Sequence, residues 1–152
     1  KVLRGISNFE QTGMRQKIVH SNGVDVIEDC YNANPDSMKA ALAMFREYPC
    51  KRRFALLGDM LELGDLSREA HEEVGRQAAE SGIDTLITYG EQARRTAVVA
   101  AAKGLTTLHA NTYREAADAL LRLMQPGDAL LVKASRGMAL EKVLELFYKE
   151  QQ

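Results

Sequence analysis

The chain has 152 residues, of which 27% are charged and 45% are hydrophobic, and its 20 basic and 21 acidic residues leave a formal net charge of −1. This length fits one domain, which can bury roughly two thirds of its unfolded surface without needing disulfides or metal ions. The near-neutral charge argues against a dedicated nucleic-acid-binding protein, and the average composition excludes disordered, collagen-like and coiled-coil chains.

The sequence contains no segment typical of membrane insertion or secretion. No apolar run approaches the roughly 18–20 residues of a membrane-spanning helix, and no signal peptide opens the chain. Cys30 and Cys50 fit no metal-ligand spacing, so we expect two reduced thiols in a cytoplasmic protein. Because the chain begins with Lys1 rather than Met, we expect it to be part of a longer protein.

The first elements predicted along the chain are the two strands of a β-hairpin. Residues 16–20 and 24–29 are strand-like, and the Asn-Gly pair at 22–23 is typical of a two-residue turn because both residues accept positive φ. Asn34 and Pro35 then predict the N-cap and the first residue of a helix.

After the hairpin, helices alternate with short apolar strands. Helices are expected at residues 35–48, 67–80, 92–103, 112–124 and 138–148. Strands are expected at residues 54–57, 86–89, 107–109 and 129–132. Ser67 is the expected N-cap of the second helix, and Thr112 with Glu115 the expected capping box of the fourth.

This alternation predicts a mostly parallel sheet with helices on both faces. We therefore expect a single α/β domain over residues 1–152 with a Rossmann-like three-layer fold, about six strands and one antiparallel edge strand from the hairpin.

Ligands of such sheets bind beyond the carboxyl ends of the strands, so the loops after the strands are the places to search. Two phosphate-binding motifs are absent from them. No two glycines stand two residues apart, which excludes G-x-G-x-x-G, and no Gly-Lys dipeptide exists, which excludes a P-loop. We expect the domain to supply only part of a nucleotide site that is completed elsewhere.

The loop after residues 24–29 holds the first candidates. Asp29 is placed to accept hydrogen bonds from ribose hydroxyls, although a turn carboxylate is an alternative interpretation. Asn32 offers an amide beside it, Tyr31 can stack on a base or pack, and Asn34 has a sufficient structural role as a helix cap.

The loop after the last predicted strand holds a second group. Lys133, Ser135 and Arg136 combine two cations and a hydroxyl just before a helix. Such a cluster suits a carboxylate or phosphate ligand, and a solvated turn is the alternative.

Three other residues are weaker candidates. Asp59 and Glu62 could bind a cation or an amine, but acidic loops are also commonly just exposed to solvent. His71 is more typical of a packing or surface residue when taken alone.

Together, these loops resemble those of the C-terminal domain of Mur ligases, over nearly the whole chain from about residue 13 to residue 147. The matching motifs are D-x-Y-N-A-N-P-x-S-M at 29–38, L-G-D-M-x-E-L-G at 57–64 and K-x-S-R-G-M at 133–138, with Ser67 and His71 between them. Two positions depart from the pattern: Ala134 stands where glycine is usual, and Cys30 where serine is common.

The resemblance implies a three-domain, ATP-dependent ligase of peptidoglycan biosynthesis, and is strongest to the members that join D-alanyl-D-alanine to UDP-N-acetylmuramoyl-tripeptide. ATP converts the tripeptide carboxylate to an acyl phosphate, and attack by the dipeptide amine yields an amide, ADP and phosphate. An N-terminal domain for the UDP-sugar peptide and a central domain with the P-loop and Mg²⁺ lie outside this chain. The complete protein is expected to be a cytoplasmic monomer that binds no nucleic acid and no membrane.

The resemblance also implies roles for individual residues, with no catalytic nucleophile and no metal ligand from this domain. The residues implied to bind ATP are Arg15, Asp29 and Asn32. Those implied to bind the dipeptide are Lys133, Ser135 and Arg136. The weaker candidates are Asn34, Asp59, Glu62 and His71.

A second interpretation of the sequence is a free-standing small-ligand or regulatory module on the same type of sheet. An acidic loop after one strand and a lysine after the last are loosely similar to receiver domains. An upstream coding sequence with a P-loop motif would establish the ligase interpretation. A native start at Lys1 would favour the free-standing module.

Overall fold

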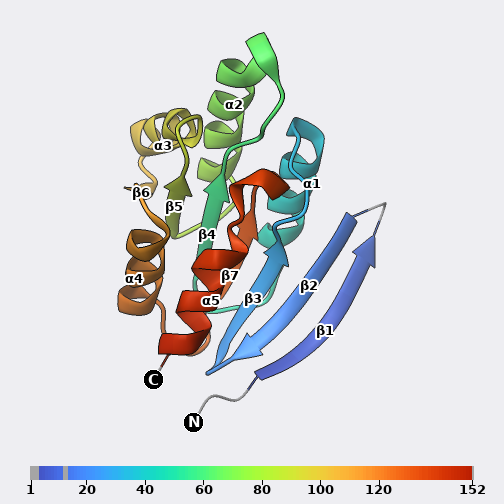
Figure 1. Ribbon diagram of the computed structural model, residues 1–152, viewed down its shortest axis with the longest axis vertical. Coiled ribbons are helices and arrows are strands. Elements are labelled where there is room, and N and C mark those ends of the chain that lie inside the picture. The colour runs from blue at the N-terminus through green and yellow to red at the C-terminus, as the bar shows by residue number, and fades with distance from the viewer. Residues whose placement is uncertain (1–3, 12–13, 152) are drawn as a thin grey trace.

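The computed structural model describes the backbone of residues 4–11 and 14–151 and the side chains of residues 16–151 (Figure 1). Within these residues, seven strands form one sheet in the order β1-β2-β3-β7-β4-β5-β6. The strands are β1 (Arg4–Gln11), β2 (Met14–Ser21), β3 (Val24–Asp29), β4 (Arg53–Gly58), β5 (Thr85–Tyr89), β6 (Thr106–Ala110) and β7 (Ala129–Lys133).

The sheet is mostly parallel, with antiparallel strands at one edge. Strands β3, β7, β4, β5 and β6 are parallel to one another, whereas β2 pairs antiparallel with both β1 and β3. The predicted hairpin is confirmed, because Asn22 and Gly23 turn the chain with φ values of 52° and 82°. Strand β1 extends the sheet beyond the six strands expected from the sequence.

Helices cover both faces of the sheet, which confirms the predicted α/β fold. The helices are α1 (Pro35–Arg46), α2 (Ser67–Ala79), α3 (Ala93–Ala102), α4 (Tyr113–Leu123) and α5 (Glu141–Glu150), with short 3₁₀ turns η1 (Gly64–Leu66) and η2 (Arg136–Met138). Helices α1, α2 and α3 share one hydrophobic core, and α4 and α5 share the other. Along β7, Leu130 and Val132 face the second core while Ala129 and Leu131 face the first, as alternation along a strand requires.

The start of α1 confirms its predicted cap. The Asn34 side chain accepts a hydrogen bond from the Ser37 amide at 2.8 Å, and Pro35 is the first helical residue. The predicted cap of α2 is wrong. Because η1 leads directly into α2, Leu66 is already helical and Ser67 lies inside the helix, where its hydroxyl donates to Gln92 instead.

The last two helices differ from the prediction in detail. Thr112 caps α4 as expected, but the Glu115 carboxylate accepts from the amide of Asn111 rather than from that of Thr112. Helix α5 begins at Glu141 instead of near residue 138, because Ala139 adopts a left-handed conformation with φ of 52° that interrupts the helix after η2.

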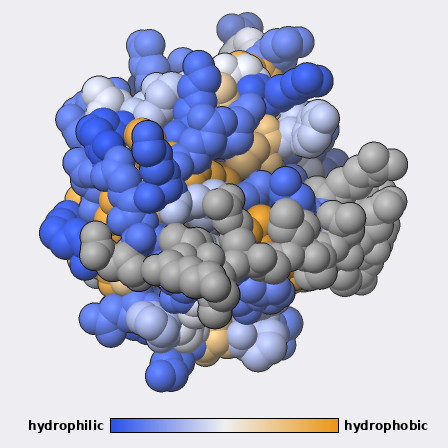
Figure 2. Space-filling model, turned by 60° about the horizontal axis from the view of Figure 1, so that its bottom comes forward, coloured by the Kyte–Doolittle hydropathy of each residue, from blue (hydrophilic) through white to orange (hydrophobic). Residues whose placement is uncertain are grey.

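In the part of the chain that the structure describes, no helix is long and apolar enough to cross a membrane. On the face shown in Figure 2, hydrophilic residues predominate outside the grey atoms, and hydrophobic residues appear as small separate spots.

The contact between α2 and α3 depends on a glycine inside a helix. A Cβ atom placed on Gly75 would lie 2.6 Å from the carbonyl oxygen of Thr96 and 2.9 Å from the Cβ of Val99, both on α3. Both distances are well inside van der Waals contact, so only glycine lets the two helices approach this closely.

We expect Gly75→Ala to lower the free energy of unfolding by about 1–3 kcal/mol, the usual cost of overpacking. At a solvent-exposed position inside a helix, a change from glycine to alanine would instead raise the free energy of unfolding by about 1 kcal/mol. Urea unfolding followed by circular dichroism measures the difference. Ala43→Gly on the exposed side of α1 is the control, with an expected loss of about 1 kcal/mol. A stabilised Gly75→Ala variant would contradict this packing.

Candidate functional site

The carboxyl ends of β3, β7 and β4 lie side by side at the upper end of the sheet in Figure 1. The loops that follow them carry the three motifs found in the sequence. We call residues 29–34, 59–63 and 133–136 the three-loop edge. The structure therefore brings together motifs that are distant in sequence, as the rule for ligand sites in such sheets predicts.

A buried ion pair joins two of these loops. Parallel pairing of β3 with β7 sets Asp29 opposite Lys133, and the Lys133 ammonium lies 2.9 Å from Asp29 Oδ2. The same ammonium donates to the backbone carbonyl of Asn32 at 2.9 Å. Lys133 is 2% exposed and Asp29 is 6% exposed. From the sequence, Asp29 is assigned to ATP and Lys133 to the dipeptide, whereas in the structure the two side chains form an ion pair with each other.

A third residue contacts the same carboxylate and was not predicted. The Gln16 side-chain amide donates to Asp29 Oδ2 at 3.3 Å, and Gln16 is buried. The hairpin contains the signal that could have found it. The turn after Ser21 fixes the register that pairs Lys17 with Glu28, and extending this register by one residue sets Gln16 opposite Asp29.

Ser135 ties the third loop to the second. Its hydroxyl accepts a hydrogen bond from the amide of Leu61 at 2.7 Å, and its own amide donates to the carbonyl of Asp59 at 3.0 Å. The hydroxyl also lies 3.5 Å from the carbonyl of Ala33 in the first loop. Ser135 therefore holds the three loops together, besides any contact with a ligand.

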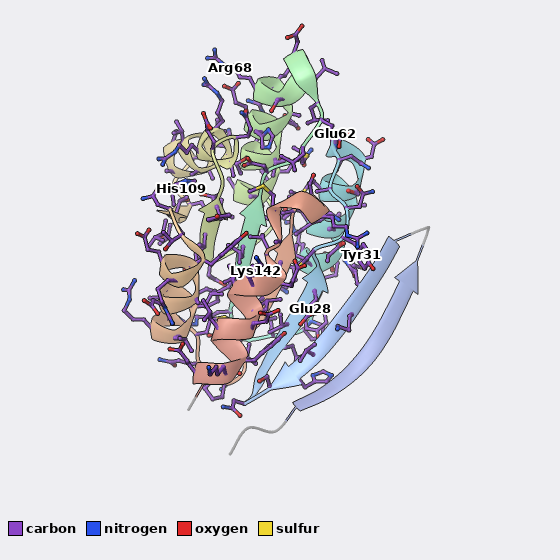
Figure 3. All side chains as sticks on the ribbon, viewed as in Figure 1. Glu28, Tyr31, Glu62, Arg68, His109 and Lys142 are labelled. Carbon is purple, nitrogen blue, oxygen red and sulfur yellow. The ribbon has the colours of Figure 1, made fainter. Side chains whose placement is uncertain are left out.

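Arg136 presents its charge toward solvent. Its guanidinium lies 5.2 Å from the centre of the Tyr31 ring, and this ring is 70% exposed. Figure 3 labels Tyr31 on the right of the molecule, beside the upper ends of β3 and β2. Among the described residues, no carboxylate forms an ion pair with Arg136. Of the two cations predicted here, Arg136 is thus the one open to an anionic ligand.

Two of the weaker candidates have structural partners. Asp59 is buried, and its carboxylate accepts a hydrogen bond from the amide of Ala93 at 2.7 Å, at the start of α3. His71 is 1% exposed, and its Nε2 accepts from the amide of Met60 at 3.0 Å. Its Nδ1 lies 2.7 Å from the carbonyl of Ser67, which assigns the ring proton to Nδ1. Both side chains thus fix the second loop.

The remaining sequence candidates lie at or near this edge. The Asn32 side chain is exposed, and Asn34 is occupied as the cap of α1. Glu62 is exposed on the second loop with φ of 64° (Figure 3). Arg15 belongs to β2, and its side chain lies outside the described ones.

The two positions that depart from the family motifs fit the fold. Burial, followed by the nearby carboxylates of Glu28 and Glu141, raises the pKa of the Cys30 thiol to about 12. Cys30 is therefore protonated at neutral pH and is not a nucleophile. Ala134 is fully buried, and a Cβ on Gly58 would lie 2.8 Å from the Ala134 Cβ. Gly58 thus provides the space that the Ala134 methyl group occupies.

In the described part of the chain, no group of three or more His, Cys, Asp or Glu side chains is arranged to hold a metal ion.

Two curated relatives share the same enzyme name. The UDP-N-acetylmuramoyl-tripeptide–D-alanyl-D-alanine ligase of Bacillus subtilis (strain 168) is 37% identical over 147 residues, which cover 93% of this chain and 32% of that relative. The ligase of the same name from Treponema pallidum (strain Nichols) is 35% identical over 156 residues, covering 99% of this chain and 33% of the relative. The chain thus spans about a third of the length of these relatives.

Solved structures of MurF ligases are also similar to this chain. MurF from Acinetobacter baumannii superposes with a TM-score of 0.78 at 26% identity, covering 95% of this chain and 30% of that one. MurF ligase from Thermotoga maritima, in complex with ADP, superposes with a TM-score of 0.73 at 28% identity and the same coverage. Residues 14–136 match the family described as the Mur ligase, glutamate ligase domain. Since this match spans most of the chain, the chain belongs to that family.

Proposed function

We propose that this chain is the C-terminal domain of the ATP-dependent ligase that joins D-alanyl-D-alanine to UDP-N-acetylmuramoyl-tripeptide. The observation that carries the proposal is the meeting of the three family motifs at one edge, which holds a buried carboxylate, Asp29, paired with Lys133, and an exposed cation, Arg136, beside Tyr31. The names of the relatives and the ADP complex of the Thermotoga maritima protein support it. Family membership does not favour a free-standing regulatory module.

In this proposal the first loop binds the nucleotide. The Asp29 carboxylate accepts hydrogen bonds from the ribose hydroxyls of ATP, as acidic residues do at the strand ends of nucleotide-binding sheets. The exposed amide of Asn32 lies on the same loop, and Arg15 contributes from β2. The phosphates and Mg²⁺ are held by the central domain, outside this chain.

The third loop receives the dipeptide in this proposal. The guanidinium of Arg136 pairs with the carboxylate of D-alanyl-D-alanine, which leaves the amine at the other end free to attack the acyl phosphate. Ser135 fixes the loop that carries Arg136 through its bonds to Leu61 and Asp59. Catalysis by this domain is then positioning of one reactant against the other, without a covalent step on its own side chains.

The proposal extends to the parts of the enzyme outside this chain. An N-terminal domain holds UDP-N-acetylmuramoyl-tripeptide, and the three-loop edge closes over the central domain. We propose a cytoplasmic monomer as the working protein, with peptidoglycan precursor synthesis as its role.

In the complete enzyme, we expect Arg136→Gln to raise KM for D-alanyl-D-alanine by about 10- to 150-fold. This range corresponds to the roughly 1.5–3 kcal/mol of a hydrogen bond to a charged group. KM for ATP should change less than twofold. Initial rates of phosphate release at varied dipeptide and ATP measure both constants. Lys103→Gln, which removes an exposed cation at the end of α3, is the matched control. An unchanged dipeptide KM in Arg136→Gln rejects the assignment of Arg136.

The isolated chain should hydrolyse no ATP and form no amide, because the phosphate and tripeptide sites belong to other domains. NMR titration of the chain with D-alanyl-D-alanine should shift the amide signals of residues 133–137. Shifts confined to other regions would place the dipeptide elsewhere.

A further inference from the structure

Lys133 is buried and already paired, so its ammonium is not available to bind the carboxylate of the dipeptide. Its ammonium has two acceptors at 2.9 Å, Asp29 Oδ2 and the carbonyl of Asn32, and only 2% of the residue is exposed. A buried charge that loses its partner is strongly unfavourable. If Lys133 turned toward a dipeptide, it would leave the Asp29 carboxylate buried without its counter-ion.

The contacts that neighbouring side chains make with the Asp29 carboxylate are confined to one of its two oxygens. Within the described residues, Lys133 and Gln16 both contact Oδ2 of the Asp29 carboxylate. Oδ1 is therefore the oxygen left to accept hydrogen bonds from a ligand. A carboxylate held through one oxygen has a fixed orientation, and an ionised carboxylate accepts hydrogen bonds without donating any. Two neighbouring hydroxyl groups are donors that suit such an oxygen.

We propose that Lys133 and Gln16 are positioning residues of the nucleotide site that act through Asp29, and that Arg136 is the three-loop-edge cation that binds the dipeptide carboxylate. This inference rests on the proposed function and reassigns Lys133 from the dipeptide to the nucleotide. Lys133 has a second effect on the same site, because its bond to the Asn32 carbonyl fixes the loop that follows Asp29.

The test compares variants of the complete enzyme by calorimetric titration with ADP and by KM for ATP and for D-alanyl-D-alanine. Lys133→Met keeps an unbranched side chain one atom shorter than that of lysine and removes the charge, and we expect at least a tenfold higher Kd for ADP. Gln16→Met removes a single neutral donor, and we expect a two- to fivefold higher Kd. Neither change should alter KM for the dipeptide more than twofold. Lys103→Met is the control for loss of an exposed cation.

A double-mutant cycle separates an effect through Asp29 from direct contact with the nucleotide. In the Asp29→Asn background, adding Lys133→Met should change the Kd for ADP less than twofold, because the carboxylate that Lys133 holds is gone. The double variant also removes both buried charges, so it serves if Lys133→Met alone fails to fold. Equal weakening of ADP binding by Lys133→Met in both backgrounds overturns the inference.

The remaining outcomes separate this inference from the proposed function. If Lys133→Met raises KM for D-alanyl-D-alanine as much as Arg136→Gln does and leaves ADP binding unchanged, the inference is wrong and the proposed function stands. If the unaltered enzyme uses neither ATP nor D-alanyl-D-alanine, the proposed function fails and the inference fails with it.

Discussion

The buried ion pair between Asp29 and Lys133 is the interaction on which the geometry of the three-loop edge depends. It joins the ends of two parallel strands, and the same ammonium holds the backbone of the first loop at Asn32. A buried pair of this kind contributes little net stability, because removing both charges from water offsets most of their attraction. Its effect is on geometry: it fixes which way a carboxylate at the strand end faces.

The polar groups at this edge divide into those that shape it and those left for ligands. Ser135, Asp59 and His71 use their hydrogen-bonding atoms on the backbone of neighbouring segments. Arg136, resting on the Tyr31 ring, keeps its charge exposed. In the proposed function, groups that are held in place before the ligand binds lower the entropic cost of positioning two reactants.

Local signals in the sequence were sufficient for much of the fold. The Asn22-Gly23 turn and the Asn34 cap depend on neighbouring residues only, and both are confirmed. The Ser67 cap was wrong because the turn preceding it is itself helical. The ion pair between Asp29 and Lys133 could not be predicted, because local sequence patterns do not give the order of strands in the sheet, in which β7 lies beside β3. The candidate residues were therefore identified, but which of them neutralise each other was not.

The order of the strands has a consequence for how the chain folds during synthesis. Strand β7 lies between β3 and β4, yet it is made after all the other strands. Until residues 129–133 leave the ribosome, β3 and β4 each have an edge with unpaired backbone groups, which is the kind of edge that promotes aggregation. The parallel sheet can close only after nearly the entire chain has been translated, and a protein truncated before β7 would lack the central strand of its sheet.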